Sequence, residues 1–410
     1  MMRLRAAVWT LASLTTMVAG QVVKGNFTLG VWLDDPDRPD TFNARMGLKM
    51  GSFEAAQSIP YDHNNVTGEI FLDPWQPKQW AYSSNVTAWK DGTDASVFMT
   101  VYADMDLTAL GKGKGMDLVT DDAITHLAIR MHDINVKTGR KVLMRWLPEM
   151  NGPWMLYGQQ PNAYVALWIR MANIFRKSAP DVKLVWSPNL DIADTSYWPG
   201  AQYVDIVGCS VYFKGYGVNP VIDQAAATSQ MGGCYSYADQ YNKPFLLSET
   251  GAGYESGVGI GTYAGVVVSD QTDKATFQKS YWAGILSKAI WAQFPHLEAA
   301  YIFEVAKQEE DFYRDYRLSV DPDVRSAFLQ LVSTVNDSLI WGNPVGATTS
   351  SMLPSISATV ATSVTAPALP TAAPSNNGDV ATTGSSSSKS GASSLSCLGP
   401  MVILAVTLLI

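Results

Sequence analysis

Short apolar segments alternate with longer amphipathic segments over most of this chain. The apolar segments are brief and rich in β-branched and aromatic residues, which is typical of buried strands. We predict strands at Leu29–Leu33, Val97–Val101, Lys141–Leu147, Val182–Trp186, Val204–Val211, Pro244–Leu247 and Ala300–Phe303, and a weaker one at Ser52–Gln57.

Helical periodicity occupies the intervals between these strands. We predict helices at Asp121–Lys137, Pro161–Ala179, Asp273–Gln293 and Asp323–Val335. Strands that alternate with helices in this way favour a parallel sheet. Eight such strands indicate a closed (β/α)8 TIM barrel, with an open doubly wound sheet as the alternative. We therefore predict a single α/β catalytic domain over residues 21–343.

The first twenty residues have the pattern of a secretory signal. Arg3 and Arg5 precede a short apolar run, and small residues come just before Gln21. The run is too short to span a bilayer. We expect residues 1–20 to be a signal peptide rather than the first helix of the mature fold.

The other end of the chain changes composition twice. Residues 344–396 are rich in Ser, Thr, Ala and Pro, so we expect a disordered linker. Residues 397–410 are apolar and follow a small-residue stretch and a polar spacer, which is the pattern of a signal for a glycosylphosphatidylinositol (GPI) anchor. A tail-anchored helix is the alternative, although the apolar segment is short for one. We expect a cell-surface protein that meets the membrane only through this lipid.

Two further features fit secretion. Sequons for N-glycosylation begin at Asn26, Asn65, Asn85 and Asn336. Of the three cysteines, Cys397 lies in the segment that the anchor reaction would remove. The remaining pair, Cys209 and Cys234, either forms a disulfide in an oxidising compartment or stays as two buried thiols.

Charge and composition narrow the chemistry. The net charge is −8 and no basic cluster is present, which argues against nucleic acid as a partner. Four scattered histidines do not form a metal-ligand spacing, so we expect neither a metal nor a cofactor. A Gly-x-Ser-x-Gly nucleophile elbow is missing from the sequence. An acidic surface suits a neutral substrate.

Two glutamates follow predicted strands. Glu149 closes the fourth strand and Glu249 the seventh. A barrel of this kind places its chemistry at the carboxyl ends of its strands, where the fourth and seventh strands face each other across the mouth. A pair of carboxylates is what glycoside hydrolysis requires, and a separation of about 5–5.5 Å selects the retaining route. We predict that these two glutamates form a catalytic pair.

Other charged residues near strand ends have different expected roles. Arg145 lies four residues before Glu149, so strand alternation places both on one face, where the arginine would keep a nucleophilic carboxylate ionised. Glu304, Glu309 and Glu310 follow the eighth strand, and we expect them to be solvated loop charges, with a hydrogen bond to sugar as the alternative.

The segment around Glu149 resembles glycoside hydrolase family 26, whose fourth-strand pattern is Arg-x-x-His-Glu-x-Asn-Gly-x-Trp. The chain has Arg145, Glu149, Asn151, Gly152 and Trp154 in register with it, and the likeness extends over about residues 27–340. The resemblance implies that Glu149 is the general acid/base and Glu249 the nucleophile. It further implies that Tyr212, after the sixth strand, hydrogen-bonds the nucleophile. The family acts mainly on β-mannan, and related enzymes cut β-1,3/1,4-glucan or β-1,3-xylan.

One residue departs from that pattern, because Pro148 stands where the family has histidine. Proline offers no side-chain hydrogen bond. Several residues near strand ends are candidates to contact sugar. Four are aromatic and one is an amide that could also cap a turn: Trp154, Trp186, Trp198, Phe213 and Asn189.

Three functions therefore remain open. The first is an endo-acting β-glycanase, on β-1,4-mannan or a β-1,3/1,4-glucan. The second is a carbohydrate-binding surface protein that keeps the barrel without turnover, a reading favoured by Pro148. The third is a cell-wall transglycosylase, which shares the covalent intermediate. We expect a monomer that acts on a polysaccharide.

Overall fold

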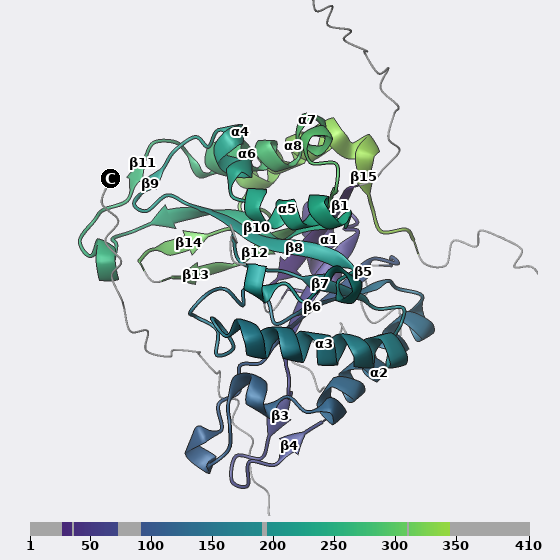
Figure 1. The fold of residues 1–410 in the computed structure, drawn as a ribbon. Helices are drawn as coiled ribbons and strands as arrows, with labels where there is room; N and C mark the ends of the chain where they lie inside the picture. The colour runs from purple at the N-terminus through teal and green to yellow at the C-terminus, as the bar shows by residue number, and fades with distance from the viewer. Residues whose placement is uncertain (1–26, 35–36, 73–91, 191–194, 310, 345–410) are drawn as a thin grey trace, which may run out of the picture. The chain divides into compact units, whose positions relative to one another are not determined.

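The computed structural model describes residues 27–34, 37–72, 92–190, 195–309 and 311–344 (Figure 1). The chain divides into two units, residues 1–346 and 347–410, and every described residue belongs to the first. The expected signal peptide, most of the linker and the anchor segment lie outside the described residues, as do Asn26 and Asn85.

Eight parallel strands close into a barrel. Consecutive strands pair along the sheet, and β12 pairs with both β1 and β10, which closes the ring. The eight strands are β1 (Phe27–Leu33), β2 (Ser52–Ser58), β5 (Ser96–Tyr102), β6 (Val142–Trp146), β7 (Lys183–Trp186), β8 (Ile206–Lys214), β10 (Phe245–Ser256) and β12 (Leu297–Glu304). Each falls on a segment predicted from the sequence, including the weaker one at β2, so the predicted TIM barrel is confirmed.

Helices lie around this barrel (Figure 1). They are α1 (Pro39–Met46), α2 (Asp121–Thr138), α3 (Pro161–Ser178), α4 (Gln224–Ser229), α5 (Gly232–Tyr241), α6 (Lys274–Ile285), α7 (Lys288–Gln293) and α8 (Pro322–Val335). Local sequence explains their ends. The hydroxyl of Thr120 accepts a hydrogen bond from the Ala123 N–H at the start of α2, and Gly139 ends that helix in the left-handed conformation. Asp273 and Asp321 cap α6 and α8 in the same way as Thr120.

The single helix expected over Asp273–Gln293 is in fact two helices, which corrects the prediction. The chain leaves helical geometry at Leu286, and Ser287 begins α7 in an extended conformation. The break lets Leu286 turn into the core, where it is buried. The indole N–H of Trp291 donates to the Ile285 carbonyl at 3.0 Å, which satisfies one of the acceptors left free at the end of α6.

Two strands are longer than the sequence indicated. β8 runs to Lys214, and β10 runs to Ser256 rather than ending at Leu247. Beyond the barrel, the hairpin of β13 (Ala306–Gln308) and β14 (Tyr313–Asp315) pairs with β10. Gly251 and Gly253 resemble loop residues in sequence, but they are needed in β10 because side chains of β14 and Tyr316 pack directly on them.

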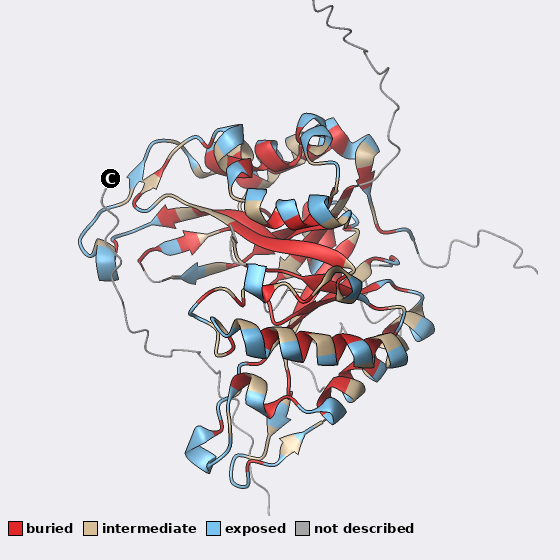
Figure 2. Ribbon diagram, in the orientation of Figure 1, coloured by how far each residue is buried: buried red, intermediate tan, exposed pale blue. Residues whose placement is uncertain are grey.

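Apolar residues fill the layer between the barrel strands and the surrounding helices. The barrel strands are largely buried (Figure 2). A separate cluster includes Phe98, Val185, Leu246 and Tyr301, from four different barrel strands. Alternation along β6 places Leu143, which packs against this cluster, on the same face as Arg145. The barrel interior therefore contains an apolar layer, and charged residues lie closer to the carboxyl ends of the strands.

Short elements complete the described part of the chain. They are β3 (Asp62–His63), β4 (Ile70–Phe71), β9 (Val218–Asn219), β11 (Ser269–Asp270) and β15 (Leu339–Ile340). The sequon residues Asn65 and Asn336 are both exposed. Among the residues described, none of the helices has the length and apolar character needed to cross a bilayer.

Cys209 of β8 and Cys234 of α5 form a disulfide, so the disulfide alternative holds and the two-thiol alternative does not. The bond ties a barrel strand to a helix 25 residues further along the chain. It also packs against the Leu190 carbonyl, which belongs to the loop that follows β7.

Replacing Cys209 by Ser should therefore lower the free energy of unfolding by about 2–4 kcal/mol, because the unfolded chain loses a crosslink. Urea unfolding of Cys209→Ser, Cys234→Ser and the double variant measures this effect. The double variant should lose no more than either single variant. Losses that add fully would contradict a shared bond as their cause.

Candidate active site

Glu149 lies in a tight turn three residues after the end of β6. Leu147 and Glu149 both have left-handed backbone conformations, with φ of 43° and 56°. Such conformations cost about 1–3 kcal/mol for residues other than glycine and persist where neighbours enforce them. Here the Glu149 N–H donates to the Ser187 carbonyl at 2.9 Å, and the Tyr157 hydroxyl donates to the Pro148 carbonyl at 2.8 Å. The turn is therefore fixed from two sides.

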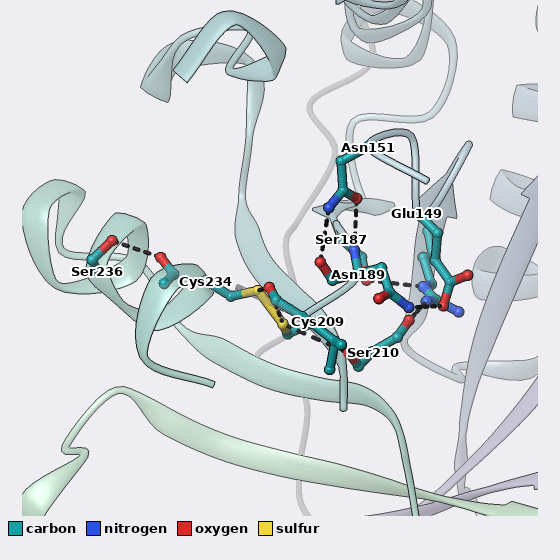
Figure 3. The surroundings of a disulfide bond; sticks show 11 residues. Glu149, Asn151, Ser187, Asn189, Cys209, Ser210, Cys234 and Ser236 are labelled. Carbon is teal, nitrogen blue, oxygen red and sulfur yellow. Dashed lines mark hydrogen bonds between the residues drawn. A yellow bond between two sulfur atoms is a disulfide. The ribbon is translucent and has the colours of Figure 1, made fainter. Parts of the chain in front are cut away.

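Two neutral donors hold the Glu149 carboxylate. The amide of Asn189 donates to Oε1 at 3.0 Å, and the indole N–H of Trp154 donates to Oε2 at 2.7 Å. Asn151 forms a reciprocal pair with the backbone of Asn189, at 2.8 and 2.9 Å (Figure 3). The Asn-Gly-x-Trp segment thus supplies one donor directly, through Trp154, and orients a second through Asn151.

Glu249 lies inside β10, at a register irregularity between Leu247 and Glu249, rather than at the end of the strand as predicted. Such bulges often redirect a side chain at an active site. A guanidinium nitrogen of Arg145 contacts Oε1, and the Tyr212 hydroxyl donates to Oε2. Glu249 is 7% exposed, so one charged and one neutral donor hold it in a nearly closed environment.

Arg145 is completely buried and has a partner on every side. Its Nε donates to the Ser187 hydroxyl at 3.0 Å, and Nη2 donates to the Ser210 hydroxyl at 2.5 Å. Its Nη1 also lies 3.6 Å from Oε1 of Glu54, a buried residue of β2. The guanidinium therefore sits between two carboxylates.

The electrostatics of these groups are coupled. Burial raises the pKa of the Glu54 carboxyl well above its usual value, Arg145 opposes that shift, and the Glu249 charge adds to it. Burial also raises the pKa of Tyr212, and the negative charges of Glu249 and Glu149 raise it further. Tyr212 therefore remains a protonated donor. The two catalytic candidates belong to one site, because Arg145, which contacts Glu249, donates to the Ser187 hydroxyl, and the Ser187 carbonyl accepts from the Glu149 N–H.

Three aromatic residues that the sequence placed at the substrate point elsewhere, which corrects those expectations. Trp186 is completely buried and packs against Tyr237 of α5. Trp198 stacks on Tyr241 at 4.8 Å in the same outer layer. Phe213 faces Phe277 of α6. Each of these rings joins the barrel to a surrounding helix, whereas Trp154 is 48% exposed beside Glu149.

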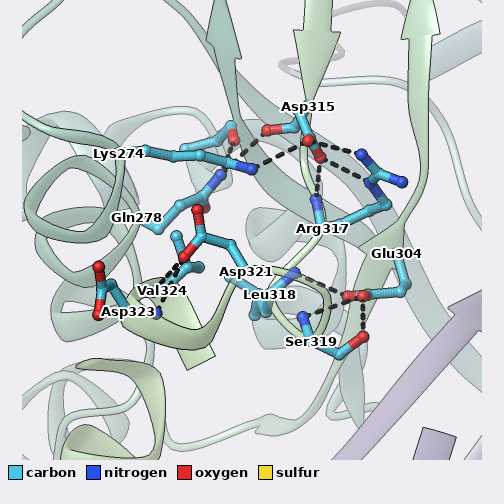
Figure 4. Close-up of polar contacts among 11 residues, drawn as sticks. Lys274, Gln278, Glu304, Asp315, Arg317, Leu318, Ser319, Asp321, Asp323 and Val324 are labelled. Carbon is cyan, nitrogen blue, oxygen red and sulfur yellow. Dashed lines mark hydrogen bonds and ion pairs between the residues drawn. The ribbon is translucent and has the colours of Figure 1, made fainter. Parts of the chain in front are cut away.

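Glu304 also differs from expectation, because it is buried rather than solvated. Its carboxylate accepts hydrogen bonds from the N–H groups of Leu318 and Ser319, at 2.8 and 3.0 Å (Figure 4). Glu309 is likewise paired, with Lys214 and Arg314. Glu310 lies outside the described residues.

Sequence reasoning missed Glu54, Ser187 and Ser210. A signal for Glu54 did exist, since a glutamate interrupts the apolar pattern of a predicted strand and would point into the barrel. The two serines carry no such signal. Within the described part of the chain, no group of three or more His, Cys, Asp or Glu side chains is arranged to hold a metal ion.

Comparisons of the sequence with known proteins also indicate a glycoside hydrolase. The sequence profile of glycosyl hydrolase family 26 matches residues 86–289. The chain is 33% identical, over 28% of its length, to mannan endo-1,4-beta-mannosidase A and B of Caldalkalibacillus mannanilyticus and to a mannan endo-1,4-beta-mannosidase of Bacillus subtilis. These matches span only 22% and 31% of the two relatives' own lengths.

Its fold is also similar to the solved catalytic domain of an endo-beta-1,4-mannanase from Bacillus sp. JAMB-750. The TM-score is 0.51 at 14% identity, over 77% of this chain and 87% of that one. At this identity the likeness supports the fold alone.

Arg145→Met should lower the free energy of unfolding by about 3–5 kcal/mol, because it leaves two buried carboxylates without their cation. Adding Glu54→Gln to that variant should recover part of the loss. Urea unfolding of both variants measures the difference. Lys288→Met, which removes one partner of an exposed ion pair, serves as the control and should change little. If Glu54→Gln instead deepened the loss, the proposed charge balance would be wrong.

Proposed function

The chain belongs to glycosyl hydrolase family 26, and we propose that it cleaves internal bonds of a β-1,4-mannan with retention of configuration. The observation that carries this proposal is the different settings of the two glutamates in one site. Glu249 is held by a cation and a phenol, whereas Glu149 is held by two neutral donors beside an exposed indole.

In the first step, a Glu249 oxygen attacks the anomeric carbon, and the bond from that carbon to the leaving oxygen breaks. Glu149 gives its proton to the leaving oxygen, so the departing chain leaves as an alcohol. The product is a glycosyl ester on Glu249. Arg145 and Tyr212 support this step because their contacts hold the carboxylate of the nucleophile in position.

In the second step, Glu149 takes a proton from water while the water oxygen attacks the anomeric carbon. The ester bond breaks and Glu249 regains its charge, which restores Glu149 as an acid. Two inversions at the same carbon give net retention. Asn189 and Trp154 keep the Glu149 carboxylate directed at the leaving oxygen throughout.

The names of the curated relatives support mannan as the polysaccharide. The exposed indole of Trp154 offers a stacking face for the sugar next to the cleaved bond. Pro148 supplies no side-chain donor, and its carbonyl is already bound by Tyr157. Sugar contacts that a histidine would make at this position must therefore come from other residues, or be absent.

We further propose that the protein is secreted, N-glycosylated and held at the cell surface by a GPI anchor, where it acts as a monomer. The signal-like first twenty residues and the apolar last segment support this location at the cell surface. The exposed Asn65 and Asn336 are accessible for glycosylation.

Glu149→Gln should reduce mannan hydrolysis by about 10²–10⁴-fold, because the leaving group loses its acid. Glu249→Gln should abolish turnover, because no ester can form. Release of reducing ends measures both, and proton NMR of the first products should show the β anomer. Glu298→Gln, an exposed glutamate of β12, is the matched control and should behave like the parent. Binding without cleavage by the parent would instead indicate a carbohydrate-binding protein, and longer products would indicate a transglycosylase.

When the full-length sequence is expressed, a phosphoinositide-specific phospholipase should release the processed protein from cells into the medium, because the lipid would be its only membrane attachment. A chain truncated after residue 343 should reach the medium without the enzyme. Immunoblots of medium and membranes measure both. Retention after treatment, in material that carries a cleavable lipid, would assign the last segment to a tail-anchored helix.

A further inference from the structure

An exposed apolar patch lies where β8 and β10 extend beyond the barrel. The patch consists of Tyr216, Val258, Ile260, Val266, Val267 and Tyr313, and we call it the rim patch. These are six of the fifteen exposed large apolar side chains among the described residues. Pairing of Val258 with Val267, and of Tyr313 with Ser256 of β10, brings its parts together. A concentration of exposed apolar residues marks a binding surface.

Tyr216 of this patch is held in place by hydrogen bonds of its backbone. Its side chain is 49% exposed, and its backbone is left-handed with φ of 55°. The N–H groups of Tyr216 and Gly217 both donate to the carboxylate of Glu255, which is completely buried. Strained residues of this kind are found at ligand sites, where surrounding contacts maintain them.

The Tyr216 ring is also supported from the side of the protein. The guanidinium of Arg314, which is completely buried, lies 5.4 Å from the centre of the ring. Tyr263 stacks on Tyr216 at 5.6 Å and contacts Phe312 in turn. A ring fixed in this way loses little entropy when a ligand binds to its exposed part.

The patch lies on the same side of the sheet as the nucleophile. Alternation along β10 places Glu255 on the face of Glu249. A continuous series of contacts covers that face: Tyr212 packs on Tyr316 at 5.3 Å, the Tyr316 hydroxyl donates to Glu309 at 3.2 Å, and Glu309 pairs with Arg314 at 2.7 Å. Arg314 then supports Tyr216. These side chains therefore form one continuous wall, by which we mean the contact series Tyr212, Tyr316, Glu309 and Arg314, from the nucleophile to the rim patch.

The charges on this wall suit a neutral ligand. Lys214 and Lys307 are both partly exposed, and their ammonium groups lie 2.9 and 3.4 Å from Glu309. Glu309 offsets part of their charge, while N–H groups remain to bind hydroxyls. Hydrogen-bond donors followed by an aromatic ring are a combination that fits a polyhydroxylated sugar.

We propose that the rim patch binds the continuation of the polysaccharide chain that Glu149 and Glu249 cleave, with Tyr216 as the principal contact. This inference rests on the proposed glycosidase function. Tyr216 is four residues beyond Tyr212 and two beyond the end of β8, so the chain separates them by at most about 13 Å. The side chains of Tyr316, Glu309 and Arg314 connect the two positions. The one sugar held between the carboxylates does not reach that far, so only longer substrates contact both sites.

Tyr216→Asn tests the proposal, because asparagine accepts a left-handed backbone while the ring is lost. The expected result is a fall of about 2–10-fold in kcat/KM on long β-1,4-mannan oligosaccharides and on the polymer, through KM, with no change on the shortest cleaved oligosaccharide. Tyr216→Trp should retain the parent's dependence on chain length. Ile129→Ala, which truncates an exposed apolar residue of α2, is the control and should have no effect.

A loss that is equal for all chain lengths, or no loss, would overturn the proposal. Dimerisation of the parent that Tyr216→Asn abolishes, without an effect of chain length, would assign the patch to self-association and overturn it as well. If the parent cleaves no glycan, the function itself fails, and gel retardation by soluble mannan then tests the patch separately. Equal retardation of the parent and Tyr216→Asn would in that case refute it.

Discussion

The barrel depends on a guanidinium that is buried between two carboxylates. Arg145 has no exposed surface, and a charge in that position is tolerated only when it is paired and its donors are satisfied. Its partners Glu54, Ser187, Ser210 and Glu249 come from, or directly follow, β2, β7, β8 and β10. A shift of one residue in any of these strands would turn a partner away from the interior. The same interaction thus fixes the register of the barrel and the position of the nucleophile.

The sequence predicted the barrel strands because strands buried on both faces appear as continuous apolar runs. β2 was the weakest of these predictions, since Glu54 interrupts its apolar pattern. The feature that weakened the prediction is therefore part of the site. The pairing of Glu149 with Glu249 could be expected because both follow apolar strand segments. Their individual partners could not, because the barrel register alone brings Ser187 and Ser210 to Arg145, and isolated serines carry no pattern.

The aromatic residues show a second limit of sequence reasoning. Trp186 and Phe213 were assigned to the substrate by their closeness to strand ends, but successive strand residues face opposite sides. Tyr212 faces the nucleophile, so Phe213 faces α6; Ser187 faces Arg145, so Trp186 faces α5. Once one strand residue is known to point into the barrel, its direct neighbours in the strand can be excluded as substrate contacts inside the barrel. The prediction that Glu304 is solvated was wrong for another reason. The loop that buries Glu304 supplies backbone donors, and their positions depend on the conformation of the loop.

The two catalytic candidates are held by different physical means, and the difference matches their proposed roles. A nucleophile has to stay ionised and fixed, and Glu249 lies in a paired strand against a permanent cation. An acid/base has to gain and lose a proton within each cycle, and Glu149 has neutral donors on a turn that opens toward the exposed Trp154. Pro148 places no donor in that turn, and Tyr157 occupies its carbonyl. Under the proposed function, recognition of the sugar chain would then depend on more distant surfaces. The extensions of β8 and β10 carry the proposed rim patch on the same strands as Tyr212 and Glu249.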